Sequence, residues 1–193
     1  MRAAVVLAAG FSRRMGTDKL LLEVGGAPMY RHALRLAAAL PVRTCIVVTN
    51  HPAIAREAEA MGFAAVPSPR AGEGMGCSVA AGAAALGSEG CAVFLNADQP
   101  FLRAETVKTL LDACETQGKI AVPVVEGVPC SPCVFPQRFY RELAALSGEM
   151  GGKAVWKRHP AGVVRVRFAD AAAFADVDTR EQYGSVRNKD FMI

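Results

Sequence analysis

The chain has 193 residues, a formal net charge of +4 and a composition that is 52% hydrophobic but only 7% aromatic. This composition favours one layered α/β domain rich in small aliphatic residues, and it excludes a disordered or disulfide-dense protein. The basic residues are spread along the chain, which argues against a nucleic-acid-binding surface but suits a polyphosphate ligand.

Short β-branched runs alternate with helical patterns in the first part of the chain. Strands are predicted at Ala3 to Leu7, Cys45 to Thr49, Phe63 to Val66 and Cys91 to Leu95. Helices are predicted at Pro28 to Leu40, Pro52 to Met61, Ser78 to Leu86 and Ala104 to Gln117. This alternation predicts an α/β fold of the Rossmann-like, three-layer α/β/α kind, with a mostly parallel sheet and right-handed crossovers. A ligand site is then expected outside the carboxyl ends of the strands.

After Lys119 the pattern becomes extended and interrupted by proline. Extended segments are predicted at Ile120 to Val125 and Val134 to Phe135, a helix at Gln137 to Leu146 and a strand at Val163 to Phe168. We interpret residues 1–193 as a single domain whose N-terminal half binds a nucleotide and whose C-terminal half binds an acceptor. The last stretch, from Tyr183 to Ile193, is predicted to be a weakly ordered tail.

The apolar runs and the cysteines indicate a cellular compartment. The longest apolar runs, such as Ala3 to Ala9 and Leu36 to Val42, fall well short of the roughly 20 residues that span a bilayer. The first run also lacks the length and charge pattern of a signal peptide. We therefore expect a cytoplasmic protein whose six cysteines are reduced.

The most informative stretch leaves the first strand and reads Leu-Ala-Ala-Gly-Phe-Ser-Arg-Arg-Met-Gly-Thr-Asp-Lys from Leu7 to Lys19. Small residues allow backbone N–H groups to approach phosphate oxygens, while the arginines and the lysine supply positive charge. The spacing matches neither the Walker A loop nor the Rossmann dinucleotide fingerprint. It predicts a triphosphate-binding loop, and the alternative is a solvated basic turn. The nucleotide-binding candidates here are Leu7, Ala8, Ala9, Gly10, Ser12, Arg13, Arg14, Gly16 and Lys19.

This stretch closely resembles the L-A-[AG]-G-x-S-x-R-M-G-x-x-K signature of the molybdenum cofactor nucleotidyltransferases. The resemblance implies a fold of the nucleotide-diphospho-sugar transferase type. It also implies CTP as the nucleotide, because Ala9 resembles the cytidylyl branch whereas a glycine is usual there in the guanylyl branch. Arg14 and Lys19 would then act catalytically by neutralising charge on the leaving pyrophosphate.

A second glycine-rich loop runs from Gly72 to Gly82 into an alanine-rich helix. It is similar to the G-M-x-x-S-[LV]-x-x-G element of the cytidylyl branch, in which Ser78 would be the helix N-cap or a nucleotide contact. The alternative is a flexible structural loop. Asn50 ends the second strand, where it either contacts a ligand or serves as a turn residue before Pro52.

Acidic residues indicate a magnesium site. Asp98, in Asp98-Gln99-Pro100, directly follows a predicted strand, and Asp178 lies in Asp176-Val177-Asp178-Thr179. Mg²⁺ prefers one or two carboxylates together with phosphate oxygens and waters. The chain resembles the family in both places, through its D-x-P and D-[IV]-D-T-x-E-x-Y motifs, which implies that Asp98 and Asp178 bind the metal and that Asp98 is catalytic. The alternative for each is a turn or helix cap.

The acceptor half departs from the family pattern. Cys130-Ser131-Pro132 stands where the cytidylyl branch usually has Gly-[Asn/His]-Pro, and Met150 replaces a lysine in the following Gly-rich motif, which ends at Lys153. The resemblance implies that Ser131, Pro132 and Lys153 contact the pterin and phosphate of the acceptor. The departures concern the acceptor rather than the nucleotidyl transfer. We interpret Cys130 and Cys133 as ordinary thiols.

The resemblance implies transfer of CMP from CTP to the terminal phosphate of molybdopterin, with Mg²⁺ bridging the substrate and pyrophosphate released. A molybdenum hydroxylase or its maturation factor is the implied protein partner, and neither nucleic acid nor membrane is expected as one. Three alternatives remain: guanylyl transfer, another phosphorylated acceptor such as a sugar phosphate or methylerythritol phosphate, and a non-catalytic module that binds nucleotide or delivers cofactor.

Overall fold

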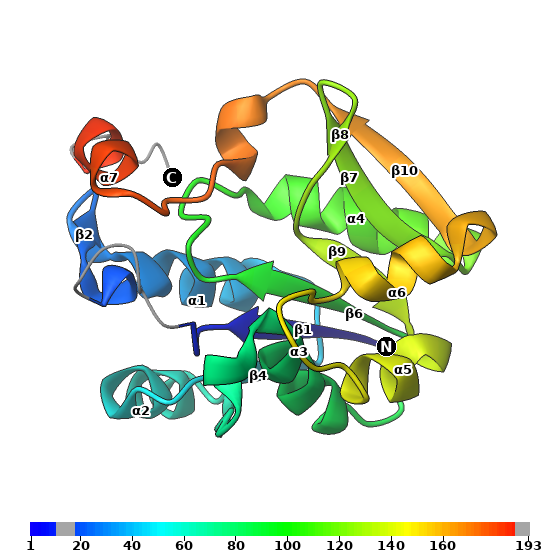
Figure 1. Ribbon diagram of the computed structural model, residues 1–193, viewed down its shortest axis with the longest axis horizontal. Helices are drawn as coiled ribbons and strands as arrows, with labels where there is room; N and C mark the ends of the chain where they lie inside the picture. The colour runs from blue at the N-terminus through cyan, green and yellow to red at the C-terminus, as the bar shows by residue number, and fades with distance from the viewer. Residues whose placement is uncertain (11–17, 188–193) are drawn as a thin grey trace.

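The buried strands predicted from the β-branched runs belong to one eight-stranded sheet (Figure 1). The computed structural model describes residues 1–10 and 18–187. The strands of the sheet are β1 (Arg2–Leu7), β4 (Thr44–Val48), β5 (Ala64–Val66), β6 (Cys91–Asn96), β7 (Ile120–Val125), β8 (Val128–Pro129), β9 (Cys133–Pro136) and β10 (Val163–Phe168). A separate two-stranded hairpin consists of β2 (Glu23–Val24) and β3 (Ala27–Pro28).

The sheet is mostly parallel. Its order is β10-β7-β9-β6-β1-β4-β5, with β8 paired to β7. β1 runs parallel to β4 and β6, β4 to β5, and β7 to β10. β9 breaks the pattern because it runs antiparallel to both of its neighbours, β6 and β7. The predicted Rossmann-like α/β/α fold with a mostly parallel sheet is confirmed.

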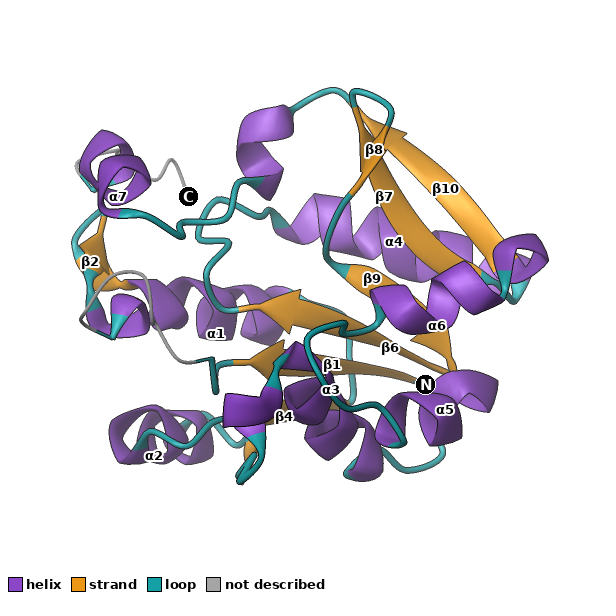
Figure 2. Ribbon diagram, viewed as in Figure 1, coloured by secondary structure: helices purple, strands orange, loops and turns teal. Residues whose placement is uncertain are grey.

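Helices cover both faces of the sheet (Figure 2). They are α1 (Met29–Ala39), α2 (Pro52–Ala60), α3 (Met75–Ala84), α4 (Ala104–Gln117), α5 (Tyr140–Ala144), α6 (Lys153–Arg158) and α7 (Arg180–Val186). Alternate side chains of β1 divide the core, since Ala4 and Val6 pack with α1, α2 and α4, whereas Val5 packs with α3, α5 and α6. Gly82 lets α3 approach β1, because a Cβ at this position would lie only 2.5 Å from Val5 Cγ1.

The strand register brings three connecting segments to one edge of the sheet. Leu7 at the end of β1 lies opposite Val48 of β4 and Asn96 of β6. The segments that follow these parallel strands therefore leave at the same carboxyl edge, where ligands bind in open α/β sheets.

The C-terminal segment is more ordered than its sequence predicts. The predicted weak order from Tyr183 onward is wrong through Val186, because these residues belong to α7. Thr179 Oγ1 accepts a hydrogen bond from the Gln182 N–H, and Gln182 Oε1 accepts one from the Thr179 N–H, which forms a capping box. Val186 also packs in a small cluster with Val24, Met29 and Val177. Residues 188–193 lie outside the described part of the chain.

Two predicted helices have different bounds. α3 begins at Met75 rather than Ser78, because the backbone of Gly74, with a φ of 131°, is not helical and the helix starts directly after it. The predicted helix from Gln137 is a 3₁₀ turn, η3 (Gln137–Phe139), followed by α5, whose last turn tightens as the Ala145 N–H bonds to Glu142 O. None of the helices in the described ranges is long and apolar enough to cross a membrane.

Candidate active site

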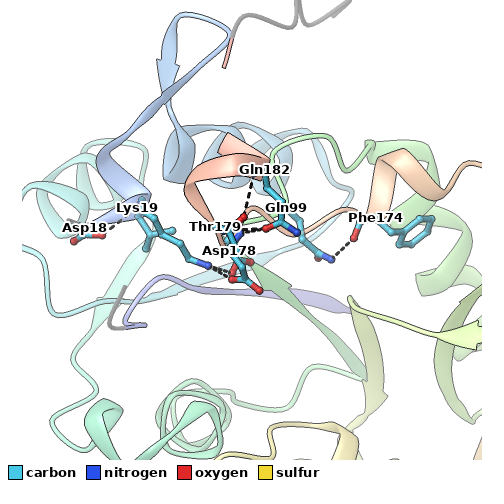
Figure 3. Close-up of polar contacts among 9 residues, drawn as sticks. Asp18, Lys19, Gln99, Phe174, Asp178, Thr179 and Gln182 are labelled. Carbon is cyan, nitrogen blue, oxygen red and sulfur yellow. Dashed lines mark hydrogen bonds and ion pairs between the residues drawn. The ribbon is translucent and has the colours of Figure 1, made fainter. Parts of the chain in front are cut away.

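Three charged side chains from distant parts of the chain meet at the carboxyl edge of the sheet. Lys19 is the first residue of η1 (Lys19–Leu21), Asp98 follows β6, and Asp178 lies shortly before α7. Lys19 Nζ lies 2.7 Å from Asp98 Oδ2 and 2.5 Å from Asp178 Oδ1 (Figure 3). The structure thus brings the predicted lysine and both predicted metal ligands into direct contact.

Local hydrogen bonds hold these side chains in place. Asp18 begins η1, because its Oδ1 accepts a hydrogen bond from the Leu20 N–H at 3.1 Å. The Val177 N–H donates to the Asp98 carbonyl oxygen at 3.0 Å, which ties the C-terminal segment to the loop after β6. The Asp178 N–H donates to Gln182 Oε1 at 2.8 Å. Two segments far apart in sequence are therefore fixed to each other through their backbones.

The cluster carries more negative than positive charge. Burial lowers the pKa of Lys19, but the carboxylates of Asp98 and Asp178 outweigh this effect, so its pKa is raised overall. Desolvation, together with the charges of Asp98 and Asp178, raises the pKa of Asp176 to about 7, against the opposing effects of Lys19 and Gln99. Asp176 is nevertheless partly open to solvent. Three carboxyl groups thus crowd around one ammonium ion.

The carboxylates fit a hard divalent cation. Asp98 Oδ1 is buried and has no hydrogen-bond partner among the described residues. Asp98 Oδ2 and Asp178 Oδ1 converge on a single cation, the Lys19 ammonium. In the described ranges no group of three or more acidic, histidine or cysteine side chains is arranged to hold a metal. Two carboxylates without such a cage suit Mg²⁺, which takes most of its other ligands from phosphates and water.

The first residues after β1 leave at the same edge of the sheet as the segment that carries Asp98. Leu7 ends β1, the Ala8 N–H donates to Val48 O at 2.8 Å, and Ala9 is buried. Gly10 is exposed, with no atom within 4 Å of the position a Cβ would take, so a ligand can approach its backbone. The other candidates of this loop lie outside the described residues, namely Ser12, Arg13, Arg14 and Gly16.

The comparison with known proteins identifies the family. The model of the MobA-like NTP transferase domain matches residues 4–163 of the chain. The chain belongs to this family. It is therefore a nucleotidyltransferase of the MobA-like family. Lys19 and Asp98 fall within the matched region, whereas Asp178 lies beyond it.

Individual relatives agree with this assignment. The purine catabolism protein PucB of Bacillus subtilis is 29% identical over 196 aligned positions, which cover 95% of this chain and 94% of PucB. The bifunctional protein GlmU of Ruegeria sp. is 38% identical over 117 residues, which cover 58% of this chain. That alignment spans only 26% of GlmU, so the chain corresponds to about a quarter of that relative.

Solved structures show the same fold. Rv0371c from Mycobacterium tuberculosis aligns with a TM-score of 0.81 at 25% identity, over 97% of both chains. A complex of Rv0371c with manganese aligns with a TM-score of 0.74 at 23% identity, over 96% of this chain and 97% of that chain. CMP:2-keto-3-deoxy-manno-octonic acid synthetase, solved with CTP, has a TM-score of 0.77 at 17% identity over 96% of each chain, a likeness of fold alone.

Asn50 and Ser78, two residues predicted to contact the nucleotide, both contact Ser68 in the loop that follows β5. Asn50 Nδ2 donates to Ser68 O at 2.8 Å, and the Ser68 N–H donates to Asn50 Oδ1 at 2.9 Å. Ser78 Oγ lies 3.4 Å from Ser68 Oγ, and only 5% of Ser78 is exposed. The alternative that Ser78 caps its helix is wrong, because α3 begins three residues earlier behind Gly74.

The predicted acceptor residues of the MobA-like chain lie in two places, after β8 and at the start of α6. Ser131 and Pro132 are joined by a cis peptide bond, and Lys153 is the first residue of α6. Cys130 and Cys133 are free thiols, and burial raises their pKa values to about 11 and about 12. Thiols with such pKa values are unreactive at neutral pH, in agreement with their interpretation as ordinary thiols.

Sequence reasoning missed Gln99, which stands inside the Asp98-Gln99-Pro100 motif as an apparent spacer. Its amide Nε2 donates to Phe174 O at 3.0 Å and to Ser131 O at 3.3 Å. Only 3% of the residue is exposed. A long amide side chain beside an aspartate predicted to bind a metal was the available signal, but only the fold shows which backbone carbonyls it meets.

Proposed function

We propose that this MobA-like nucleotidyltransferase transfers CMP from CTP to the terminal phosphate of molybdopterin or the molybdenum cofactor and releases pyrophosphate. The observation that carries the proposal is the contact of Lys19 with Asp98 and Asp178 at the carboxyl edge of the sheet, where β1 also ends. It provides a cation for phosphate oxygens and carboxylates for a metal at one point. The family supports NTP-dependent transfer to a small phosphorylated molecule.

The proposed reaction needs little covalent chemistry from the protein. An oxygen of the acceptor phosphate attacks the α-phosphorus of CTP, the new P–O bond forms, and the bond to pyrophosphate breaks. The acceptor phosphate is already ionised at neutral pH, so no general base is required. Lys19, together with Arg14, neutralises charge on the leaving pyrophosphate. Asp98 and Asp178 would hold Mg²⁺, which supplies charge stabilisation on the phosphate oxygens.

The two halves of the chain take different roles in this proposal. The segments after β1, β4 and β5 bind the nucleotide, with Ala9 favouring CTP over GTP. Ser131, Pro132 and Lys153 bind the acceptor. The resemblance of residues 7–19 to the molybdenum cofactor nucleotidyltransferases supports this acceptor, and a molybdenum hydroxylase or its maturation factor is then the proposed protein partner.

A second candidate is transfer to another phosphorylated small molecule. Met150 favours it, because this side chain is 57% exposed and stands where the molybdenum cofactor enzymes carry a lysine. The exchange removes a positive charge that the resemblance assigns to contact with molybdopterin, which favours an acceptor held by other contacts.

Incubation of the protein with molybdopterin, Mg²⁺ and each of the four NTPs, followed by mass analysis of the products, tests the proposal. We expect a cytosine dinucleotide and pyrophosphate from CTP. A guanine dinucleotide would instead assign GTP, and pyrophosphate release only with a sugar phosphate or methylerythritol phosphate would assign a different acceptor. If no NTP yields pyrophosphate with any acceptor, the protein is a binding or delivery module and the proposal is wrong.

A further inference from the structure

The short segment after β6 connects three parts of the site. The Ala97 N–H donates to Leu7 O at 3.1 Å, which joins the segment to the end of β1. The Asp98 carbonyl oxygen accepts the hydrogen bond from Val177, which joins the segment to the C-terminal strip before α7. Gln99 adds the third connection through its side chain. Residues 97–99 are therefore hydrogen-bonded to the end of β1, to the segment before Asp178 and to the acceptor loop at Ser131.

The Gln99 side chain lies between two backbone carbonyl groups. Nε2 donates to the carbonyl oxygens of Phe174 and Ser131, and Figure 3 shows the amide pointing to Phe174. Two acceptors on this side identify the nitrogen, because an amide oxygen placed there would donate to neither. Phe174 ends η5 (Ala171–Phe174), four residues before Asp178, and Ser131 is next to Pro132 of the acceptor loop.

The other atom of the amide is not explained by stability. Gln99 Oε1 is buried and has no hydrogen-bond partner among the described residues. A buried acceptor without a donor costs stability, whereas the amide nitrogen supplies donors to two backbone carbonyls. The contribution of the amide therefore lies in its two donor hydrogens, which connect two loops.

We propose that Gln99 is a positioning residue that sets the distance between the acceptor loop and the segment that carries Asp178. This inference rests on the proposed function, because it assigns Ser131 and Pro132 to the acceptor. Gln99 touches no reacting atom; it holds the two loops so that the acceptor phosphate meets the α-phosphorus in line. A displacement of about 1 Å at this step is enough to lower a rate by about 100-fold.

The variant Gln99→Met tests the proposal, since methionine keeps the length of the side chain but has no hydrogen-bond donor. We expect KM for the acceptor to rise and kcat to fall, each by about 10-fold. The dissociation constant for CTP, measured calorimetrically without acceptor, should stay unchanged. Ile54→Val is the matched control, because Ile54 is fully buried in α2, a helix that carries none of the predicted site residues.

Each outcome decides a different question. If the acceptor KM of Gln99→Met is unchanged, Gln99 is only structural and the proposal is wrong. The same conclusion follows if Gln99→Met and Ile54→Val, at equal melting temperature, show equal changes in acceptor KM and in kcat. If the wild type transfers no nucleotide to molybdopterin, the proposed function fails and the inference fails with it. If Gln99→Met does not fold, Gln99→Asn serves instead. Its shorter amide reaches only one carbonyl, so an acceptor KM above that of the wild type is expected, and an unchanged one refutes the proposal.

Discussion

Replacing Lys19 with methionine removes the ammonium ion that lies between Asp98 and Asp178 while keeping an unbranched side chain. In the absence of nucleotide the ammonium is a competitor for any divalent cation, because it occupies the oxygen atoms that would bind the metal. Its loss leaves the carboxylates to repel one another. Lys19→Met should therefore bind metal better, yet be less stable without metal and less active.

The expected loss of stability in Lys19→Met follows from the exposed fractions of the three side chains, which are 15% for Lys19, 20% for Asp98 and 43% for Asp178. Removing one partner of a fully buried pair costs about 3–5 kcal/mol, and an exposed pair contributes at most about 1 kcal/mol. We expect these partly exposed pairs to contribute about 2 kcal/mol together, which lowers Tm by about 4–8 °C in a protein of this size. Turnover should fall by about 100-fold to 1,000-fold, as when one electrostatic donor is removed from an active site.

Calorimetric titration of nucleotide-free protein with Mn²⁺ separates these effects. Lys19→Met should bind Mn²⁺ at least about 10-fold more tightly than the wild type, which corresponds to about 1.4 kcal/mol. Saturating Mn²⁺ should restore most of the lost Tm. Lys108→Met is the control, because Lys108 is an exposed lysine on α4. Unchanged Mn²⁺ affinity together with near-wild-type turnover in Lys19→Met would refute the reasoning.

Further predictions concern Asp98 and three positions outside the Lys19 cluster. Asp98→Asn should lower kcat by at least about 100-fold with a smaller loss of Tm than Lys19→Met, because Lys19 keeps its contact with Asp178. Asp112→Asn on α4 should leave turnover unchanged, and near-wild-type turnover in Asp98→Asn contradicts its role. Gly82→Ala should reduce the free energy of unfolding in urea by about 1–3 kcal/mol, because the added Cβ would meet a valine of β1 at 2.5 Å. Gly184→Ala in α7, which has no atom within 4 Å of the new Cβ, should be neutral or stabilising. Hydrogen bonds from an arginine of α1 lower the pKa of Glu57. Its contribution to stability is therefore present above pH about 4.5 and is lost as the pH falls through the lower pKa of the folded state. The urea midpoint of Glu57→Gln should lie below that of the wild type at pH 7 and approach it at pH 3.

The core of the fold and part of the site could be predicted because regular strands carry strong signals. Buried β-branched runs located β1 and β6, and α4 has the predicted bounds, Ala104–Gln117. Since parallel strands end at one edge, a carboxylate after β6 and a cation after β1 were expected to meet. Asp98 and Lys19 do meet, although 79 positions separate them in the sequence.

The parts that escaped prediction are short elements whose stability comes from distant contacts. α7 has seven residues, too few for a clear period, and it depends on the Thr179–Gln182 capping box and on the contacts of Val186. The six-residue helix α6 and the β2–β3 hairpin were not predicted for the same reason. The role of Gln99 depends on two carbonyl groups from other segments, and no local pattern reports such a meeting.

On the proposed acceptor side, the backbone contacts that shape a loop do not depend on the charge of its exposed side chain. The loop that contains Met150 is held by its backbone, because the Gly76 N–H donates to Gly148 O at 2.9 Å. Gly152 lies so close to the Phe135 ring that a Cβ would come within 2.8 Å of Cζ. Met150 itself is exposed, so the exchange of lysine for methionine leaves these contacts intact and removes only a charge. In the proposed function, nucleotidyl transfer depends on the Lys19 cluster, whose charged residues are all present, whereas acceptor choice depends on exposed side chains that can change without disturbing that cluster. The motifs therefore predict the reaction class more firmly than they predict the acceptor.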